Sequence, residues 1–549
     1  MFARRQLDVS DFHSRCLGDS LQIDLSRRQQ IPFWTLALLV ASLFACAQPS
    51  LRPPDKSAAP NILFIMSDDH AIAAVSAYGS ELIDTPNIDR IAAEGIRFTN
   101  SFVTNSICAP SRAVMLTGRY SHLNGLRDNR DTFDGSQQTL PKLLQQGGYQ
   151  TAIIGKWHLK SDPTGFDEWR ILIGQGEYYN PIFNINGVET KVIGYVTDLI
   201  TDQALEWLDG RDRSQPFALL YQHKASHRNW MPAERHLGLY ADHDLPVPET
   251  FRDDYAGRPA AAAQDMRIAD LWLTLDLKIH PESFDVDAAS GGRDDWDPIG
   301  SWRGSYERLT SEQRTAWDAY YQPINESFRD NPPQGEALDE WKLRRYLEDY
   351  LGTVAALDEN IGRVLDYLDA EGLAENTIVV YTSDQGFYLG EHGWYDKRFM
   401  YEESLRMPLV MRYPAGFSAG QTVDELVLNL DFAPTFLDLA DTPIPADMQG
   451  RSLRALVDGS PTPEWRDAIY YRYYEYPHGW HLVRPHYGVR TERYKLIHFE
   501  GDMDHWELYD LETDPQEMRN LYGVEEYSSV QEQLHARLAE LRRELKDEA

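Results

Sequence analysis

Two continuous apolar runs, each ending in carboxylates, constrain the fold of this chain most strongly. The first covers residues 62–66 and leads into Asp68 and Asp69, and the second covers residues 377–381 and leads into Asp384. Continuous apolar runs of this length are typical of strands that are buried on both faces of a sheet. Because ligands gather at the carboxyl ends of strands in such sheets, we expect these carboxylates to mark a binding site.

Further short apolar runs alternate with helical patterns along the chain. Candidate strands cover residues 151–154, 217–221 and 409–411, and the clearest helical spacing of apolar residues covers residues 338–368. This alternation predicts the α/β class, with a large mixed sheet sandwiched by helices.

The pattern changes after Gly450. Three short segments then alternate like antiparallel strands: residues 469–474, 487–491 and 494–498. A helical pattern closes the chain. We therefore expect a large domain over residues 61–450, with an insertion at about 240–335, and a smaller C-terminal α+β domain over residues 451–549.

The N-terminal part of the chain has the features of a bacterial export segment. A pair of arginines precedes an apolar run over residues 31–45, which is too short to cross a bilayer comfortably. Cys46 follows this run, at the position of the lipidated cysteine in a lipoprotein signal. We expect residues 1–46 to be the export signal and residues 47–60 a linker, with the mature protein in the periplasm or anchored by a lipid at Cys46. An uncleaved N-terminal anchor is the alternative.

Charge and cysteine content narrow the possible functions. The chain has 86 acidic and 53 basic residues and a formal net charge of −33, which repels nucleic acids and anionic lipids. We expect no nucleic-acid partner, and an anionic substrate would need a local cluster of cations. Apart from Cys16 and Cys46 in the export segment, the only cysteine is Cys108. The mature chain then has no disulfide framework, and Cys108 needs a functional explanation.

The segment around Cys108 contains the most specific motif in the sequence. Residues 108–112 are Cys-Ala-Pro-Ser-Arg, and residues 116–118 are Leu-Thr-Gly. This segment resembles the signature of the type I sulfatases of the alkaline phosphatase superfamily, in which a maturation enzyme oxidises the cysteine to formylglycine. On its residue type alone, Cys108 could also be a buried structural cysteine at the start of a helix.

Further segments are similar to motifs of the same family. Residues 155–158 are Gly-Lys-Trp-His, residues 223–228 are His-Lys-Ala-Ser-His-Arg, and Asp384-Gln385-Gly386 is followed by Gly-Glu-His-Gly at 390–393 and by Lys397. The resemblance covers roughly residues 61–510.

Two positions depart from the family pattern. Ser226 stands where the family commonly has proline, so His223 competes with His227 for the role of catalytic histidine. Gln385 replaces the more usual asparagine or histidine, a change that keeps an oxygen ligand.

The resemblance implies a metal site at the strand ends. Asp68, Asp69, Asp384 and Gln385 offer hard oxygen atoms, which suit Ca²⁺ better than zinc, and the modified side chain of Cys108 would complete the set. Mg²⁺ is the alternative ion. An aspartate after a strand often caps a helix instead, so Asp68 and Asp69 gain this meaning only together with the other ligands.

The resemblance also implies a covalent mechanism at position 108. Hydrated formylglycine carries two hydroxyls on one carbon: one attacks sulfur, and the other later loses its proton so that sulfate is expelled. The metal and Arg112 would lower the pKa of the attacking hydroxyl.

Four further side chains receive roles from the same resemblance. His158 would be the base for the second step. Lys156 and Lys397 would hold the sulfate oxygens, and His227 would protonate the leaving alcohol, with Lys397 as its rival for that role.

The expected substrate is a sulfated carbohydrate. Residues 223–255, 474–478 and 484–491 resemble segments of bacterial sulfatases that act on glycans, such as those containing N-acetylglucosamine 6-sulfate, mucins or algal polysaccharides. Candidate substrate contacts are His223, His478, His481, Arg484 and His486. A phosphodiester or phosphonate monoester hydrolase of the same superfamily is one alternative. The other is an inactive glycan-binding lipoprotein, which should have lost one of Cys108, Arg112, Lys156 or Asp384.

Overall fold

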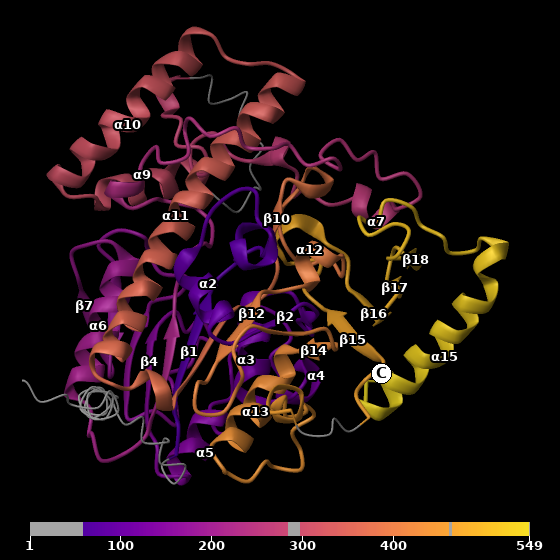
Figure 1. Ribbon diagram of the computed structural model, residues 1–549. Coiled ribbons are helices and arrows are strands. Elements are labelled where there is room, and N and C mark those ends of the chain that lie inside the picture. The colour runs from indigo at the N-terminus through magenta and orange to yellow at the C-terminus, as the bar shows by residue number, and fades with distance from the viewer. Residues whose placement is uncertain (1–58, 284–296, 460–463, 548–549) are drawn as a thin grey trace, which may run out of the picture. The chain divides into compact units, whose positions relative to one another are not determined.

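The computed structural model describes residues 59–283, 297–459 and 464–547 (Figure 1). The predicted export signal, the lipid site at Cys46 and most of the predicted linker lie outside these residues. Everything described below belongs to one compact unit, which begins at residue 56. Within the described ranges, none of the helices is both long enough and apolar enough to span a membrane.

A ten-stranded mixed sheet forms the frame of this unit. The strands lie in the order β13-β2-β12-β9-β1-β8-β4-β5-β6-β7. Their bounds are β1 (Asn61–Ser67), β2 (Ile96–Phe98), β4 (Gln150–Gly155), β5 (Glu168–Leu172), β6 (Ile182–Ile185), β7 (Val188–Lys191), β8 (Phe217–Gln222), β9 (Thr377–Ser383), β12 (Leu409–Arg412) and β13 (Gln421–Val423). Central β1 is parallel to both neighbours, with Leu63 opposite Leu219 of β8 and Val379 of β9, and β4 is parallel to β8. Four adjacent strands therefore end at the same edge of the sheet.

Helices cover both faces of this sheet. Ile62, Phe64 and Met66 of β1 point into one apolar core, and Leu63 and Ile65 point into the other. The first face is covered by α3 (Cys108–Thr117), α5 (Leu140–Gln146) and α13 (Phe432–Leu439), and the second by α2 (Pro86–Ala93), α6 (Val196–Gly210) and the second half of α11 (Glu336–Ala370). The predicted helix-covered sheet is confirmed, and the double burial of β1 explains its continuous apolar run.

Shorter elements complete the unit. The predicted insertion contains α7 (Pro259–Ala262), α9 (Pro298–Arg308) and α10 (Ser311–Asp330). The remaining short helices are α4 (Ser121–Asn124), α12 (Glu402–Leu405) and α14 (Arg454–Val457), and two small strand pairs are β3 (Ser101–Phe102) with β14 (Val427–Leu428) and β10 (Tyr388–Leu389) with β11 (Tyr395–Asp396). The helix predicted over residues 338–368 is confirmed by α11.

The C-terminal part forms a four-stranded antiparallel sheet followed by a helix (Figure 1). The strands are β15 (Ala468–Tyr473), β16 (His486–Thr491), β17 (Tyr494–Phe499) and β18 (His505–Asp510), and α15 (Ser528–Glu544) packs against them. The predicted α+β character is confirmed, although β18 was missed. Tyr471 of β15 accepts the backbone N–H of Ser106 at 3.1 Å, so this sheet supports the segment that leads to Cys108.

Candidate active site

Side chains from four neighbouring strand ends meet at one edge of the sheet. Asp384 follows β9, Asp68 and Asp69 follow β1, and Lys156 follows β4, while β8 leads into the segment that carries His227. One oxygen from each of Asp68, Asp69 and Asp384 lies within 4.8 Å of the others, and all three side chains are buried. The structure therefore brings together the three carboxylates that the sequence predicts as metal ligands.

Carboxylates this close repel one another unless protons or cations compensate their charge. Burial raises the pKa of Asp384 to about 8, and the nearby Asp68 adds to this rise. Burial also raises the pKa of Asp69 to about 6, although Lys397 opposes it. Burial acts in the same direction on Asp68, but Lys156 and other cations hold the pKa of that carboxyl well below its usual range.

The donor set fits a divalent cation. Oδ1 of Asp68 and Oε1 of Gln385 are buried and have no hydrogen-bond partner within the described part of the chain. Gln385 directs its Nε2 toward Oδ1 of Asp69, and a half-turn of the amide would present its oxygen instead. Hard oxygen atoms of carboxylates and amides are the ligands that Ca²⁺ prefers. These residues could therefore hold a metal ion.

Cys108 is the first residue of α3 and lies beside the carboxylates. Its Sγ is 3.9 Å from Nε2 of Gln385, and it lies within 4.8 Å of ligand atoms of Asp68 and His227. The helix start places the positive end of the helix dipole at this position, which favours an anion. Burial raises the pKa of the thiol well above its usual value, and the charge of Asp68 adds to the rise. An unmodified thiol here would therefore be a poor nucleophile.

Arg112 lies one helical turn after Cys108 and joins three strand ends. Its Nε and Nη2 donate to Oδ2 of Asp384 at 3.1 and 2.9 Å. Its Nη1 donates to the carbonyl of Lys156 and to Oε1 of Gln222, each at 3.0 Å. Only 2% of Arg112 is exposed, so this side chain fixes the relative positions of β9, β4 and β8 at the site.

Two lysines each contact a different carboxylate of the acidic cluster. Nζ of Lys156 donates to Oδ2 of Asp68, and Nζ of Lys397 donates to Oδ2 of Asp69 at 2.8 Å. Gly155, directly before Lys156, has a φ of +113°, and a Cβ there would lie 1.7 Å from the Gln222 carbonyl oxygen. Only glycine allows this close approach of the strands, which explains the Gly-Lys pair in the motif.

Two of the predicted histidines, His158 and His227, line the pocket above Cys108. Nε2 of His227 lies 3.8 Å from Oδ2 of Asp69, and its Nδ1 donates to the Arg228 carbonyl at 2.6 Å. Nδ1 of His158 has no hydrogen-bond partner among the described residues. Burial lowers the pKa of both rings well below the usual value, and Lys156 adds to this effect, so both are neutral in the free protein.

The pocket has a volume of about 790 Å³. Trp272, Leu275 and Arg308 come from the predicted insertion, so this segment lines the pocket. Other lining residues are Asn129, Arg130, Lys224, Arg228, Asp396, Lys397, Arg398, Glu475, His478, Trp480 and His481. The pocket thus combines many cations with aromatic rings, although the whole chain is strongly acidic.

Three of the predicted substrate contacts lie outside the pocket lining. His223 is fully buried, with its ring 4.3 Å from that of Tyr221. His486 is fully buried and accepts the backbone N–H of Met400 at 3.1 Å. Arg484 pairs with Asp502 at 3.3 Å. The structure therefore gives these three residues structural partners and no contact with the pocket, whereas His478 and His481 do line it.

A charged cluster of Asp396, Arg398 and Glu475 lies beside Lys397, and none of these three residues was predicted from the sequence. Oδ1 of Asp396 accepts from Nε of Arg398 at 2.9 Å, and Nη1 of Arg398 donates to Glu475 at 2.8 Å. Nε2 of His481 lies 3.3 Å from Oδ2 of Asp396. Burial would raise the pKa of Asp396, but Lys397, Arg398 and His481 hold it well below its usual range. The sequence feature that could have indicated this cluster is the run of three consecutive charged residues at 396–398.

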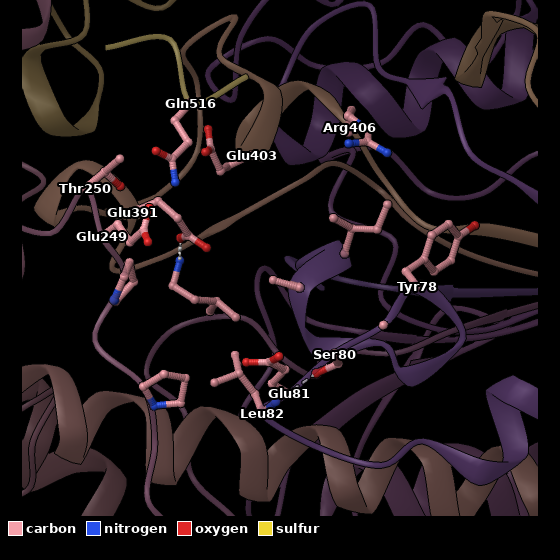
Figure 2. A pocket seen from close by; sticks show the side chains of 16 residues that line it. Tyr78, Ser80, Glu81, Leu82, Glu249, Thr250, Glu391, Glu403, Arg406 and Gln516 are labelled. Carbon is pink, nitrogen blue, oxygen red and sulfur yellow. Dashed lines mark hydrogen bonds between the residues drawn. The ribbon is translucent and has the colours of Figure 1, made fainter. Parts of the chain in front are cut away.

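A second pocket of about 400 Å³ has different lining residues (Figure 2). Figure 2 shows Glu249, Glu391 and Glu403 on one side, with Arg406 on the other. Glu81 adds a fourth carboxylate. This second pocket contains none of the predicted catalytic residues, whereas the pocket above Cys108 is lined by Cys108, His158, His227 and Lys397 and is therefore the better candidate for the active site.

Comparisons with known proteins agree with this assignment. The family model described as Sulfatase matches residues 60–442, and that of the N-sulphoglucosamine sulphohydrolase C-terminal region matches residues 390–544. An N-acetylglucosamine-6-O-sulfatase of Bacteroides thetaiotaomicron is 49% identical over 520 residues, which cover 93% of this chain and 91% of that protein.

Solved structures agree as well. A protein solved in complex with its substrate D-glucosamine-2-N,6-O-disulfate is 50% identical, with a TM-score of 0.84, and the match covers 89% of this chain and 99% of that one. The phosphonate monoester hydrolase of Agrobacterium radiobacter has a TM-score of 0.63 at 21% identity, over 88% of this chain and 96% of that one, which shows a shared fold alone. Because the family model matches most of its length, this chain belongs to the sulfatase family of sulfuric ester hydrolases.

Proposed function

We propose that the protein hydrolyses the 6-O-sulfate ester of an N-acetylglucosamine-type residue in a glycan and releases inorganic sulfate. The observation that carries this proposal is the relative of that activity, which is 49% identical along 93% of the chain. The cation-rich pocket above Cys108 supports it, because an anionic ester needs positive charge around its oxygen atoms.

The proposed nucleophile is formylglycine, formed from Cys108 by a maturation enzyme. Its hydrate would supply a hydroxyl for attack on sulfur, a task for which the buried thiol with its raised pKa is poorly suited. The position of Cys108 at the start of α3, beside three carboxylates, supports this assignment.

Ca²⁺ is the proposed ion, with Mg²⁺ as the alternative. Asp68, Asp69, Asp384 and Gln385 would hold it together with the side chain at position 108. A bound divalent cation would supply positive charge near the sulfate oxygens. Arg112 holds Asp384 in place for this purpose.

The two lysines would bind the sulfate group, and the two histidines would transfer protons. Lys156 and Lys397, which contact Asp68 and Asp69, would also bind sulfate oxygens. His158 is neutral in the free protein and can accept the proton that must leave before sulfate is released. His227 would protonate the leaving sugar oxygen, and the negative charge of the bound ester favours the imidazolium form that this step requires.

The charged cluster beside Lys397 would bind the sugar ring. Asp396 and Glu475 offer acceptors, and Arg398 offers donors, in a buried part of the pocket. Adjacent sugar hydroxyls are both donors and acceptors, so a carboxylate next to a guanidinium suits them. His478 and His481 line the same pocket and are further candidates for contact with the glycan.

One other function remains as an alternative. The phosphonate monoester hydrolase shares the fold, and a hydrolase of phosphodiesters or phosphonate monoesters would use the same nucleophile. The inactive glycan-binding lipoprotein is not supported, because Cys108, Arg112, Lys156 and Asp384 are all present at the site. Export to the periplasm, with or without a lipid at Cys46, remains part of the proposal.

A desulfation screen tests the proposal directly. The protein is produced together with a maturation enzyme, and mass spectra of the peptide containing residue 108 establish how much is converted. Free sulfate is then measured from N-acetylglucosamine 6-sulfate, its 3-sulfate isomer, galactose 6-sulfate and an aryl phosphodiester. We expect the first compound to react fastest. Faster turnover of the phosphodiester than of any sulfate ester would contradict the proposal.

A further inference from the structure

Lys224 is a buried lysine that the proposed mechanism does not use. It follows β8, lines the pocket above Cys108 and is only 3% exposed. Nζ donates to the backbone carbonyls of Gln175 and Arg228, each at 3.4 Å, and lies 4.9 Å from the ring centroid of Tyr178. In the described ranges it forms no ion pair with a carboxylate. A buried ammonium group without a direct ion pair is costly, so its presence needs an explanation.

One backbone carbonyl connects Lys224 to His227. The Arg228 carbonyl accepts from Nδ1 of His227 at 2.6 Å and from Nζ of Lys224 at 3.4 Å. Nδ1 must carry a hydrogen to make this bond, which leaves Nε2 as the ring nitrogen toward Asp69, 3.8 Å away. The orientation of this carbonyl therefore sets both the tautomer and the ring position of His227.

Two further contacts join Lys224 and His227. The backbone N–H of His227 donates to the Lys224 carbonyl at 2.9 Å, which closes a tight turn. The hydroxyl of Tyr178, whose ring lies under the Lys224 ammonium, donates to the His227 carbonyl at 2.7 Å. Burial lowers the pKa of Lys224 to about 8, so the ammonium form still predominates at neutral pH and can donate to both carbonyls.

We propose that Lys224 is a positioning residue for His227: its ammonium group holds the Arg228 carbonyl so that Nε2 of the histidine points at the sugar oxygen of the ester. This inference rests on the proposed function, in which His227 protonates the leaving group. When the S–O bond breaks, its electron pair stays on the sugar oxygen, which takes the proton from Nε2 of the His227 imidazolium and leaves the neutral ring with its hydrogen on Nδ1. The sulfuryl group passes to the nucleophile at position 108, and the Nδ1–H bond to Arg228 is kept.

This role predicts a dependence on the leaving group. A sugar alkoxide is a poor leaving group and needs the proton, whereas 4-nitrophenolate leaves readily without it. General acid catalysis contributes roughly 10²- to 10⁴-fold, so misplacing the acid should cost at least about tenfold on a sugar sulfate. The same change should lower kcat on 4-nitrophenyl sulfate by less than about threefold, because this leaving group needs little help from a general acid.

The test compares kcat and KM on both substrates for Lys224→Met, Lys224→Gln, His227→Ala and the Lys224→Met/His227→Ala double variant. Lys160→Met is the matched control, because Lys160 is exposed and also donates to a backbone carbonyl, that of Arg130, at 2.8 Å. We expect Lys224→Met to lose kcat on the sugar sulfate selectively, and Lys224→Gln, which keeps an N–H donor, to lose less. The double variant should be no slower on the sugar than His227→Ala, because the two residues act as one unit.

Equal losses on the sugar and aryl sulfates in a folded Lys224 variant would overturn the inference, as would fully additive losses in the double variant. Melting temperatures establish folding, and Lys224→Gln decides the matter if Lys224→Met does not fold. The loss of kcat on the sugar sulfate is compared with the loss on 4-nitrophenyl sulfate, and the sugar used is whichever sulfated sugar the wild type turns over. A wrong sugar would therefore reject the proposed substrate and leave this comparison intact.

Discussion

Nε and Nη2 of Arg112 both donate to the same oxygen of Asp384, at 3.1 and 2.9 Å, in a fully buried ion pair. Removing one partner of such a pair leaves an uncompensated charge and costs about 3 to 5 kcal/mol. We expect Arg112→Met to lower the free energy of unfolding by that amount in metal-free protein above about pH 8, because burial raises the pKa of Asp384 to about 8 and the carboxyl is ionised only above it. Chemical denaturation measures this loss. Arg90→Met is the control, because Arg90 forms surface ion pairs with Asp366 and Asp369 and should cost less than about 1 kcal/mol. Equal costs for the two variants would contradict the expectation.

Chelation of divalent cations should lower both activity and thermal stability. A ligand that binds only the folded state stabilises it by about 2.7 kcal/mol at a hundredfold excess over its Kd, so its removal gives a measurable fall in Tm. Asp384→Asn should abolish this response, because it removes one of the three carboxylates that would hold the ion. Asp441→Asn, whose side chain is 91% exposed, should respond to chelation like the wild type. An unchanged Tm after proven metal loss would count against the site.

Replacing Cys108 with alanine should abolish turnover and leave the fold unchanged. The side chain is buried at the first position of α3, and alanine fits a helix start of this kind without adding volume. Sulfate release and Tm are measured on the same preparation. Substantial residual activity in that preparation would refute the assignment of position 108 as the nucleophile.

The sequence predicted those parts of the fold and site that depend on local patterns. β1 and β9 are buried on both faces, so their apolar runs are continuous and their ends are visible in the sequence. Asp68, Asp384 and Lys156 follow directly after such strands, which is why their meeting at one edge could be expected. β18 was not predicted because His505, Trp506 and Glu507 break the apolar alternation that is typical of a strand.

The remaining site residues have no local signal because their partners are distant in the chain. Arg398 bonds to Glu475, 77 residues away, and both would look like surface charges in isolation. His223 and His227 belong to one short segment, yet the first is buried beneath Tyr221 and the second lines the pocket. The path of the backbone after β8 decides which of the two histidines reaches the pocket. The residue pattern of this short segment does not predict that path.

Arg398 offers a test of sugar recognition at a residue that is neither a proposed sulfate ligand nor a proposed metal ligand. Arg398→Met removes the donor that lies between Asp396 and Glu475 while keeping the length of the side chain. We expect the KM for N-acetylglucosamine 6-sulfate to rise at least tenfold, in line with about 1.5 to 3 kcal/mol for a charged hydrogen bond. The KM for 4-nitrophenyl sulfate, which lacks the ring hydroxyls, should change little. Arg130→Met, at an exposed position of the same pocket, is the comparison, and a parallel rise for both substrates would argue against sugar contact.

Glu507 should make stability depend on pH, independently of the active site. Its side chain is buried in the C-terminal sheet, where it accepts from the hydroxyls of Tyr401 and Tyr509, each at 2.8 Å. Burial raises its pKa from 4.5 to about 7. Between these values the folded protein binds the proton and the unfolded chain does not, so the free energy of unfolding falls as the pH rises through this window. At about 1.4 kcal/mol per pKa unit, the full loss is on the order of 3 kcal/mol.

Glu507→Gln replaces the titrating group with a neutral acceptor and should remove this part of the pH dependence. The free energy of unfolding is measured by urea denaturation at about pH 5 and about pH 8 for the wild type and the variant. Glu492→Gln, at an exposed position in the turn between β16 and β17, should keep the wild-type slope. If Glu507→Gln also keeps that slope, burial in the C-terminal sheet does not hold the proton on Glu507, and the pH dependence must come from other groups.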